Sequence, residues 1–156
     1  MHKSSARVAG VLLASTLTPF AFAAHTHLST PSTWTLNVGE SNMGTGPVMK
    51  SDTFVVLTDT DKWAKWTDVM VDGDGKTWKT SWSGPADGTP HPMTGMDGNW
   101  STNAATDVST MTLQDGSVQT CNFSLSSDKK KFHEKCVVKS PDGKQINQTL
   151  VYDRIK

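Results

Sequence analysis

The chain has 156 residues, with 15 basic and 15 acidic side chains that balance to a formal net charge of zero. This balance gives no electrostatic reason to expect a nucleic acid or an anionic membrane surface as a partner. The length suits one domain with a modest core.

The N-terminal segment has the layout of a secretory signal peptide. Two basic residues precede a mostly small and apolar run, and Ala21-Phe22-Ala23 fits an A-x-A cleavage site. The run is too short to span a bilayer, and no later segment approaches a transmembrane length. We therefore expect an exported protein, periplasmic or extracellular, with a signal peptide at 1–23, a flexible arm at 24–33 and one domain at 34–156.

The mature part of the chain reads as a series of hairpins. Short stretches rich in Val, Thr, Trp and Phe are separated by turns, and Asp-Gly, which favours tight hairpin turns, occurs six times. No window has apolar residues at helical spacing over three turns. We expect an all-β antiparallel up-and-down barrel, which also removes exposed sheet edges, with a sandwich as the alternative. The expected strands are about eight: 34–38, 53–58, 64–71, 77–83, 108–113, 117–125, 131–139 and 145–153.

Cys121 and Cys136 lie at equal distances from a polar turn. Side chains alternate along a strand, so folding the segment at that turn places both cysteines on one face. We expect a cross-strand disulfide, as is common in exported proteins, that contributes about 3 kcal/mol. Free thiols or a reactive cysteine are the alternatives. The same register gives the pairs Cys121–Cys136, Phe123–Glu134 and Leu125–Phe132.

Aromatic residues and one acidic residue are the candidates for lining a ligand cavity. Trp78 and Trp82 share a strand face, where they either contact a ligand or, as we favour, fill the core or cap the barrel. Glu134 falls on the apolar face of the cysteine hairpin, so it is either a paired inward carboxylate or a sign that this face is partly wet. The candidate lining residues are Trp34, Trp78, Trp82, Phe123, Phe132 and Glu134.

A histidine and two methionines, His91, Met93 and Met96, occur within six residues. Imidazole and thioether ligands suit Cu(I), so copper binding here is one hypothesis. In the favoured interpretation the protein needs no cofactor, Met93 points inward as an apolar wall residue, and the other two lie on a loop surface. Pro90 and Pro92 lack backbone donors, which favours a poorly paired, strand-like crossing.

Catalytic motifs are absent from the sequence. It contains no G-x-S-x-G, no H-E-x-x-H and no glycine-rich phosphate loop. We therefore expect a protein that is not an enzyme.

Four segments each contain a motif with characteristic spacing of residues such as Trp, Asn, Gly and Asp. They are W-x-L-N-x-x-x-S-x-x-x-x-G-P-x-x-K-S at 34–51, V-D-x-D-G-K at 71–76, D-G-x-x-x-P-x-T-G at 87–95 and V-Y-D at 151–153. Together they resemble small secreted bacterial lipocalin-like proteins, of largely uncharacterised role. The chain departs from that group in its cysteine pair and in Met93, which stands where Val is usual.

The resemblance implies a calycin-type β-barrel and brings no catalytic residues. An eight-stranded barrel is either filled by side chains or holds one small ligand, and the fold alone does not decide between these. The leading expectation is a non-enzymatic exported barrel that binds a small apolar or amphipathic molecule. The alternatives are periplasmic copper binding, and a filled barrel with a structural or envelope-interaction role.

Overall fold

The computed structural model describes residues 27–156, so the expected signal peptide at 1–23 lies outside the described part. Within that part, no helix is long and apolar enough to cross a membrane. The described residues form ten strands: β1 (Ser32–Leu36), β2 (Met49–Asp59), β3 (Trp63–Asp72), β4 (Thr77–Pro85), β5 (His91–Pro92), β6 (Gly98–Asn103), β7 (Val108–Leu113), β8 (Val118–Leu125), β9 (Lys131–Lys139) and β10 (Gln145–Arg154).

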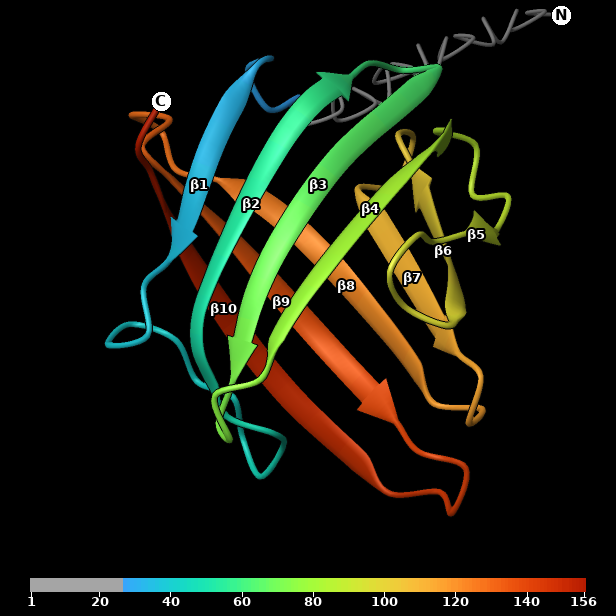
Figure 1. Cartoon of the computed structure of the whole chain (residues 1–156). Helices are drawn as coiled ribbons and strands as arrows, with labels where there is room; N and C mark the ends of the chain where they lie inside the picture. The colour runs from blue at the N-terminus through green and yellow to red at the C-terminus, as the bar shows by residue number, and fades with distance from the viewer. Residues whose placement is uncertain (1–26) are drawn as a thin grey trace, which may run out of the picture.

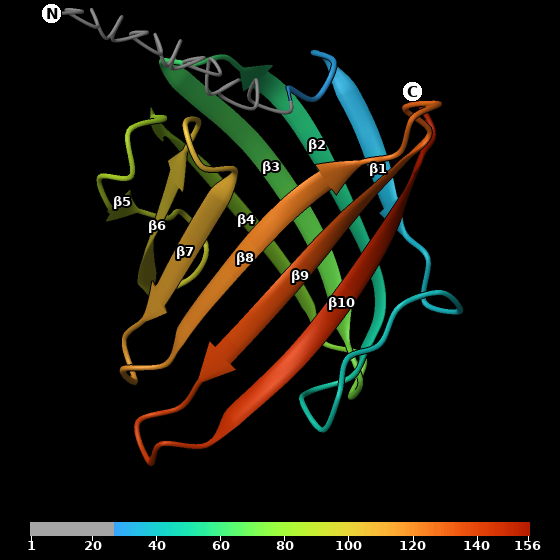
Figure 2. The ribbon, with the colours of Figure 1, turned by 180° about the vertical axis from the view of Figure 1, so that it is seen from behind.

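The strands form one antiparallel sheet that curls into a nearly closed barrel. Its strand order is β4-β3-β2-β1-β10-β9-β8-β7-β6-β5. Strands β1 to β4 make the nearer wall in Figure 1, β8 to β10 cross behind them, and β5 to β7 stand at one side. Figure 2 shows the molecule from the opposite side, with the wall of β8 to β10 nearest the viewer. The expected all-β up-and-down barrel is confirmed, but it has ten strands and not about eight.

The two strands beyond the expected eight are β5 and β6. The first corresponds to the strand-like crossing expected around Pro92. The second was missed because its sequence, GNWSTN, has Trp100 as its only large apolar residue, while Thr102, next on the same face, is polar though buried. A strand with a mixed inner face lacks the alternation by which strands are recognised.

A short seam connects the two edges of the sheet and makes the barrel nearly closed. We use "seam" for the isolated bridges Ser81–Thr94 and Asp87–Asn103, which connect β4 and the residues after it to the segment after β5 and to β6. The amides of Ser81 and Thr94 donate to each other's carbonyls at 3.0 and 2.9 Å. Gly95 follows with φ 85°, and a Cβ there would lie 1.9 Å from a backbone oxygen of β4. This close approach requires glycine.

The β8–β9 hairpin has the register predicted from its turn. Cys121 pairs with Cys136, Phe123 with Glu134, and Leu125 with Phe132. The cysteines form the predicted disulfide, and both are buried. The bridge therefore lies on the inner face of the barrel.

The core at one end of the barrel is built around Trp34. Its ring meets that of Phe132 edge-on at 5.0 Å, and Phe132 stacks on Tyr152 at 4.4 Å. The indole nitrogen of Trp34 donates to the Ser32 hydroxyl at 2.8 Å, so this buried donor is satisfied.

Residues 27–33, expected to belong to a flexible arm, contact the barrel. The amide of Leu28 donates to the Asp59 carboxylate at 2.6 Å, and the His27 ring lies 2.9 Å from the Asp61 carboxylate. Strand β1 begins at Ser32, two residues earlier than expected, and ends at Leu36.

Candidate functional site

The barrel contains a cavity of about 410 Å³. Inward side chains supply its walls at every second position, as on β3, where Ala64, Trp66, Asp68 and Met70 all line it. Most lining side chains are apolar or aromatic. Five are methionines, whose flexible thioether side chains adapt to ligands of different shape: Met49, Met70, Met93, Met96 and Met111.

Three carboxyl groups and a phenol lie together in this cavity. We call Asp52 on β2, Asp68 on β3, Glu134 on β9 and Tyr152 on β10 the acidic cluster. In the sheet, β1 lies between β2 and β10. The Tyr152 hydroxyl on β10 donates a hydrogen bond to Asp52 Oδ2 on β2 at 2.7 Å. The Asp68 carboxyl hydrogen-bonds to Asp52, and the Thr80 hydroxyl lies 3.5 Å from Asp68 Oδ2. Two carboxyl groups can bond to each other only when one carries a proton.

Burial changes the protonation of the acidic cluster. Loss of hydration raises the pKa of Asp68 from 3.8 to about 9, helped by its hydrogen bond to Asp52 and by the Asp52 charge. Burial, with a smaller effect of Asp52, also raises the pKa of Glu134 from 4.5 to about 8. Burial and the nearby carboxylates raise the pKa of Tyr152 well above 10. At neutral pH both Asp68 and Glu134 are therefore protonated.

Several buried polar atoms of residues that line the cavity have no hydrogen-bond partner among the described residues. Asp52 is only 5% exposed. Within the described residues, Asp52 Oδ1 and Asp68 Oδ1 meet no donor group, and the buried Trp66 Nε1 meets no acceptor. The proton implied by the raised pKa of Asp68 is the only hydrogen that these two oxygens can share. Buried polar groups are nearly always satisfied in native proteins, so these exceptions are candidates for contact with a ligand or bound water.

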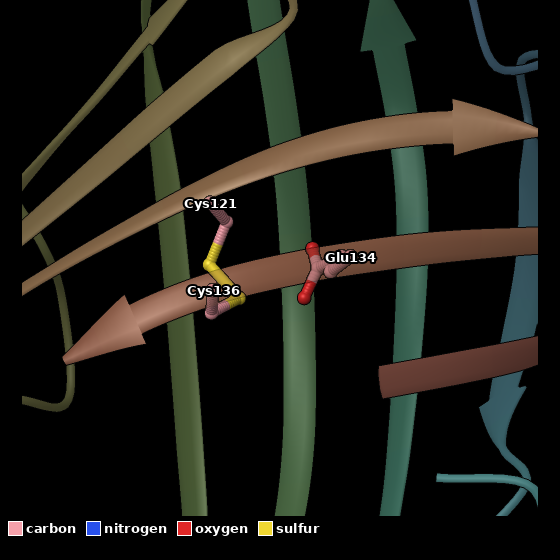
Figure 3. Close-up of side chains that lie close together, drawn as sticks. All are labelled: Cys121, Glu134 and Cys136. Atoms are coloured by element: carbon pink, nitrogen blue, oxygen red, sulfur yellow. A yellow bond between two sulfur atoms is a disulfide. The ribbon is translucent and has the colours of Figure 1, made fainter. Parts of the chain in front are cut away.

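Glu134 lies beside the disulfide (Figure 3). Ligand atoms of Cys121, Glu134 and Cys136 lie within 4.8 Å of one another, and no other such trio of His, Cys, Asp or Glu occurs among the described residues. Both sulfurs are bonded to each other, whereas metal binding requires thiolates. The trio is therefore not a metal site while the disulfide is intact.

The six candidate lining residues separate into two groups. Phe123, Phe132 and Glu134 line the cavity. Trp34 and Trp82 are buried in the core and do not line it. Trp78 also lies outside the lining, near the β3–β4 turn, where its indole nitrogen donates to Asp72 Oδ2 at 3.0 Å.

The copper hypothesis depended on His91, Met93 and Met96. Both methionines line the cavity, but His91 does not. The His91 ring instead lies 6.4 Å from that of Trp82, and its buried Nε2 has no hydrogen-bond partner among the described residues. The structure thus brings together two of the three candidate ligands, and copper binding stays a prediction.

Asp52 and Asp68 are the two carboxyl groups of the acidic cluster that the sequence analysis missed. A signal for both was present. Asp68 is two residues after Trp66, and Asp52 is two residues before Phe54, so period-two alternation places each carboxylate on the face of an aromatic residue. Their proximity to Glu134 could not be deduced, because it depends on how the sheet closes.

A comparison of the sequence with known protein families gave no match, and neither did a comparison with curated proteins. The class of protein therefore rests on the fold and the site. The chain forms an antiparallel β-barrel, compatible with the lipocalin-like architecture, with an internal cavity that carries buried carboxyl groups.

Proposed function

We propose that the protein is a non-enzymatic exported barrel of the lipocalin-like type that binds a small apolar or amphipathic molecule in its interior. The observation that carries this proposal is the cavity of about 410 Å³. Ligand cavities in proteins are typically about 300–1,000 Å³, mostly apolar, with a few convergent polar groups. A filled barrel with a structural or envelope role would have its interior occupied by side chains.

The cavity walls support an amphipathic ligand. Aromatic rings of Trp66 and Trp100, 5.4 Å apart, form one apolar surface, and the methionines add an adaptable one. The acidic cluster supplies polar atoms within the same space. Export is inferred from the N-terminal segment, which has a basic start, an apolar run and an A-x-A site.

The proposal is tested with the uncharged probe N-phenyl-1-naphthylamine, whose fluorescence rises in apolar surroundings. We expect saturable enhancement with the wild-type protein. The variant Met111→Trp puts a larger side chain into the cavity and is expected to weaken binding at least tenfold. Thr112→Trp is the matched control, because Thr112 is the next residue on β7 and is exposed. Absence of enhancement, or equal binding by Met111→Trp, would contradict the proposal.

A further inference from the structure

Four acidic residues line the cavity, and three of them, Asp52, Asp68 and Glu134, form no ion pair within the described residues. The fourth is Asp59, and among the described residues no lysine, arginine or histidine lines the cavity. Buried carboxylates are rarely left without a cation or a full set of donors.

The pair Asp52–Asp68 has one oxygen on each carboxyl group that no donor group of the described residues reaches. Each carboxyl has one oxygen in contact with a hydroxyl group, from Tyr152 or Thr80. The other oxygen of each meets no donor group in the described chain. The Asp52 residue is only 5% exposed, and it lines the cavity. The proton shared by the two carboxyl groups is the only hydrogen available to these oxygens, and a cation in the cavity can take its place.

A compact metal ion fits this arrangement poorly. A metal needs several ligand atoms around one point, and the three carboxylates of the acidic cluster do not come together closely enough. Among the described residues, the only close trio of this kind is Cys121, Glu134 and Cys136, whose sulfurs are bonded to each other. An organic cation needs no such convergence, because its charge is spread over a larger group and its apolar part contacts the walls.

We propose that the cavity binds an amphiphilic organic cation, an amine or quaternary ammonium compound whose charged head lies against Asp52 and Asp68 while its apolar part contacts the Met and Trp walls. This inference rests on the proposed function and names the class of its ligand. Trp66 precedes Asp68 by two residues on the same strand face, so an aromatic ring lies next to the head-group position. Aromatic faces attract ammonium groups.

Binding of such a cation must be linked to proton release. The groups that face the head position are Asp52 from β2, Asp68 from β3, Glu134 from β9 and Tyr152 from β10, with only the Thr80 hydroxyl from β4. The cation takes the place of the proton shared by Asp52 and Asp68 and lowers the raised pKa of Asp68 and of Glu134. Affinity for a permanently charged ligand is therefore expected to rise between pH 6 and pH 9.

The test compares three probes that share a ten-carbon chain: decyltrimethylammonium, decanol and decanoate. Each competes with N-phenyl-1-naphthylamine below its micelle concentration. We expect the cation to displace the dye at a concentration at least tenfold lower than decanol, with decanoate the weakest. Calorimetry of cation binding at pH 7, in two buffers of different ionisation enthalpy, is expected to show proton release.

Variants then locate the head group. Asp68→Asn keeps the shape of the side chain and is expected to remove most of the preference for the cation over decanol. Asp52→Asn is expected to do the same. Asp97→Asn, at an exposed aspartate outside the cavity, is the matched control and is expected to change nothing.

The outcomes separate this inference from the proposed function. If decanol binds as well as the cation, or if the preference survives in both Asn variants, the inference is wrong while the barrel remains a carrier of apolar molecules. If neither the dye nor any of the three probes binds, both proposals fail. If one Asn variant does not fold, the other variant and the wild-type probe series still decide.

Discussion

Glu134→Gln is expected to stabilise the barrel at alkaline pH. The folded protein holds the Glu134 proton up to about pH 8, whereas an exposed glutamate releases it near pH 4.5. The pKa is raised on folding, so the stability linked to this proton is complete below pH 4.5 and is lost as the pH rises to about 8. Glutamine has no proton to lose, so the variant lacks this dependence.

The size of the effect follows from the pKa of Glu134. A rise from 4.5 to about 8 corresponds to an upper limit of about 5 kcal/mol in the free energy of unfolding. Glu134 keeps part of its surface exposed to the cavity, where solvent stabilises the charged form. We therefore expect Glu134→Gln to gain about 2 kcal/mol at pH 9 and less than about 1 kcal/mol at pH 5.

Urea unfolding at pH 5 and pH 9, followed by tryptophan fluorescence, measures this difference. A gain of about 2 kcal/mol moves the midpoint by roughly 1 M urea for a domain of this size. Asp97→Asn, which removes an exposed carboxylate, is the control and is expected to leave the midpoint unchanged at both values. The reasoning is refuted if Glu134→Gln is less stable than the wild type at pH 9, or if its gain is equal at both values.

Three further variants test separate parts of the structure in the same assay. Replacing Cys121 and Cys136 by serine is expected to lower the free energy of unfolding by about 3 kcal/mol, and an unchanged midpoint would show that the bridge does not restrain the unfolded chain. Tyr152→Phe removes the donor to Asp52 Oδ2 and is expected to cost about 1–3 kcal/mol; a neutral result would mean that another donor replaces it. Gly95→Ala forces a Cβ against β4 at a positive φ and is expected to cost more than about 1 kcal/mol, unless the seam can open without loss.

The sequence was most informative where a turn defines the register. The three residue pairs predicted from the polar turn between the cysteines all occur in the β8–β9 hairpin, including Phe123 with Glu134. Side chains alternate strictly along a strand, so one correct turn fixes which of them point inward. Spacing alone therefore placed Glu134 on the apolar face of the hairpin, either as a paired inward carboxylate or as a sign that this face is partly wet.

Features that depend on closure were not accessible in this way. Asp52 and Asp68 come from neighbouring strands, but Glu134 reaches them from the opposite wall of the barrel. Their interaction depends on the curvature of the whole sheet, and no local pattern encodes that. Likewise, β6 was missed because its buried face combines Trp100 with the polar Thr102.

The seam has a consequence for the dynamics of the barrel. Strands β9 and β10 are paired along a ladder of nine residue pairs, whereas the seam consists of two isolated bridges. Local opening of the seam breaks fewer bonds than separation of β9 from β10, so amide hydrogens of Ser81 and Thr94 should exchange with solvent faster than those of β9 and β10. Met93 and Met96 flank Thr94 and line the cavity. Local opening of the seam would thus expose the cavity through the side wall of the barrel and not through an open end.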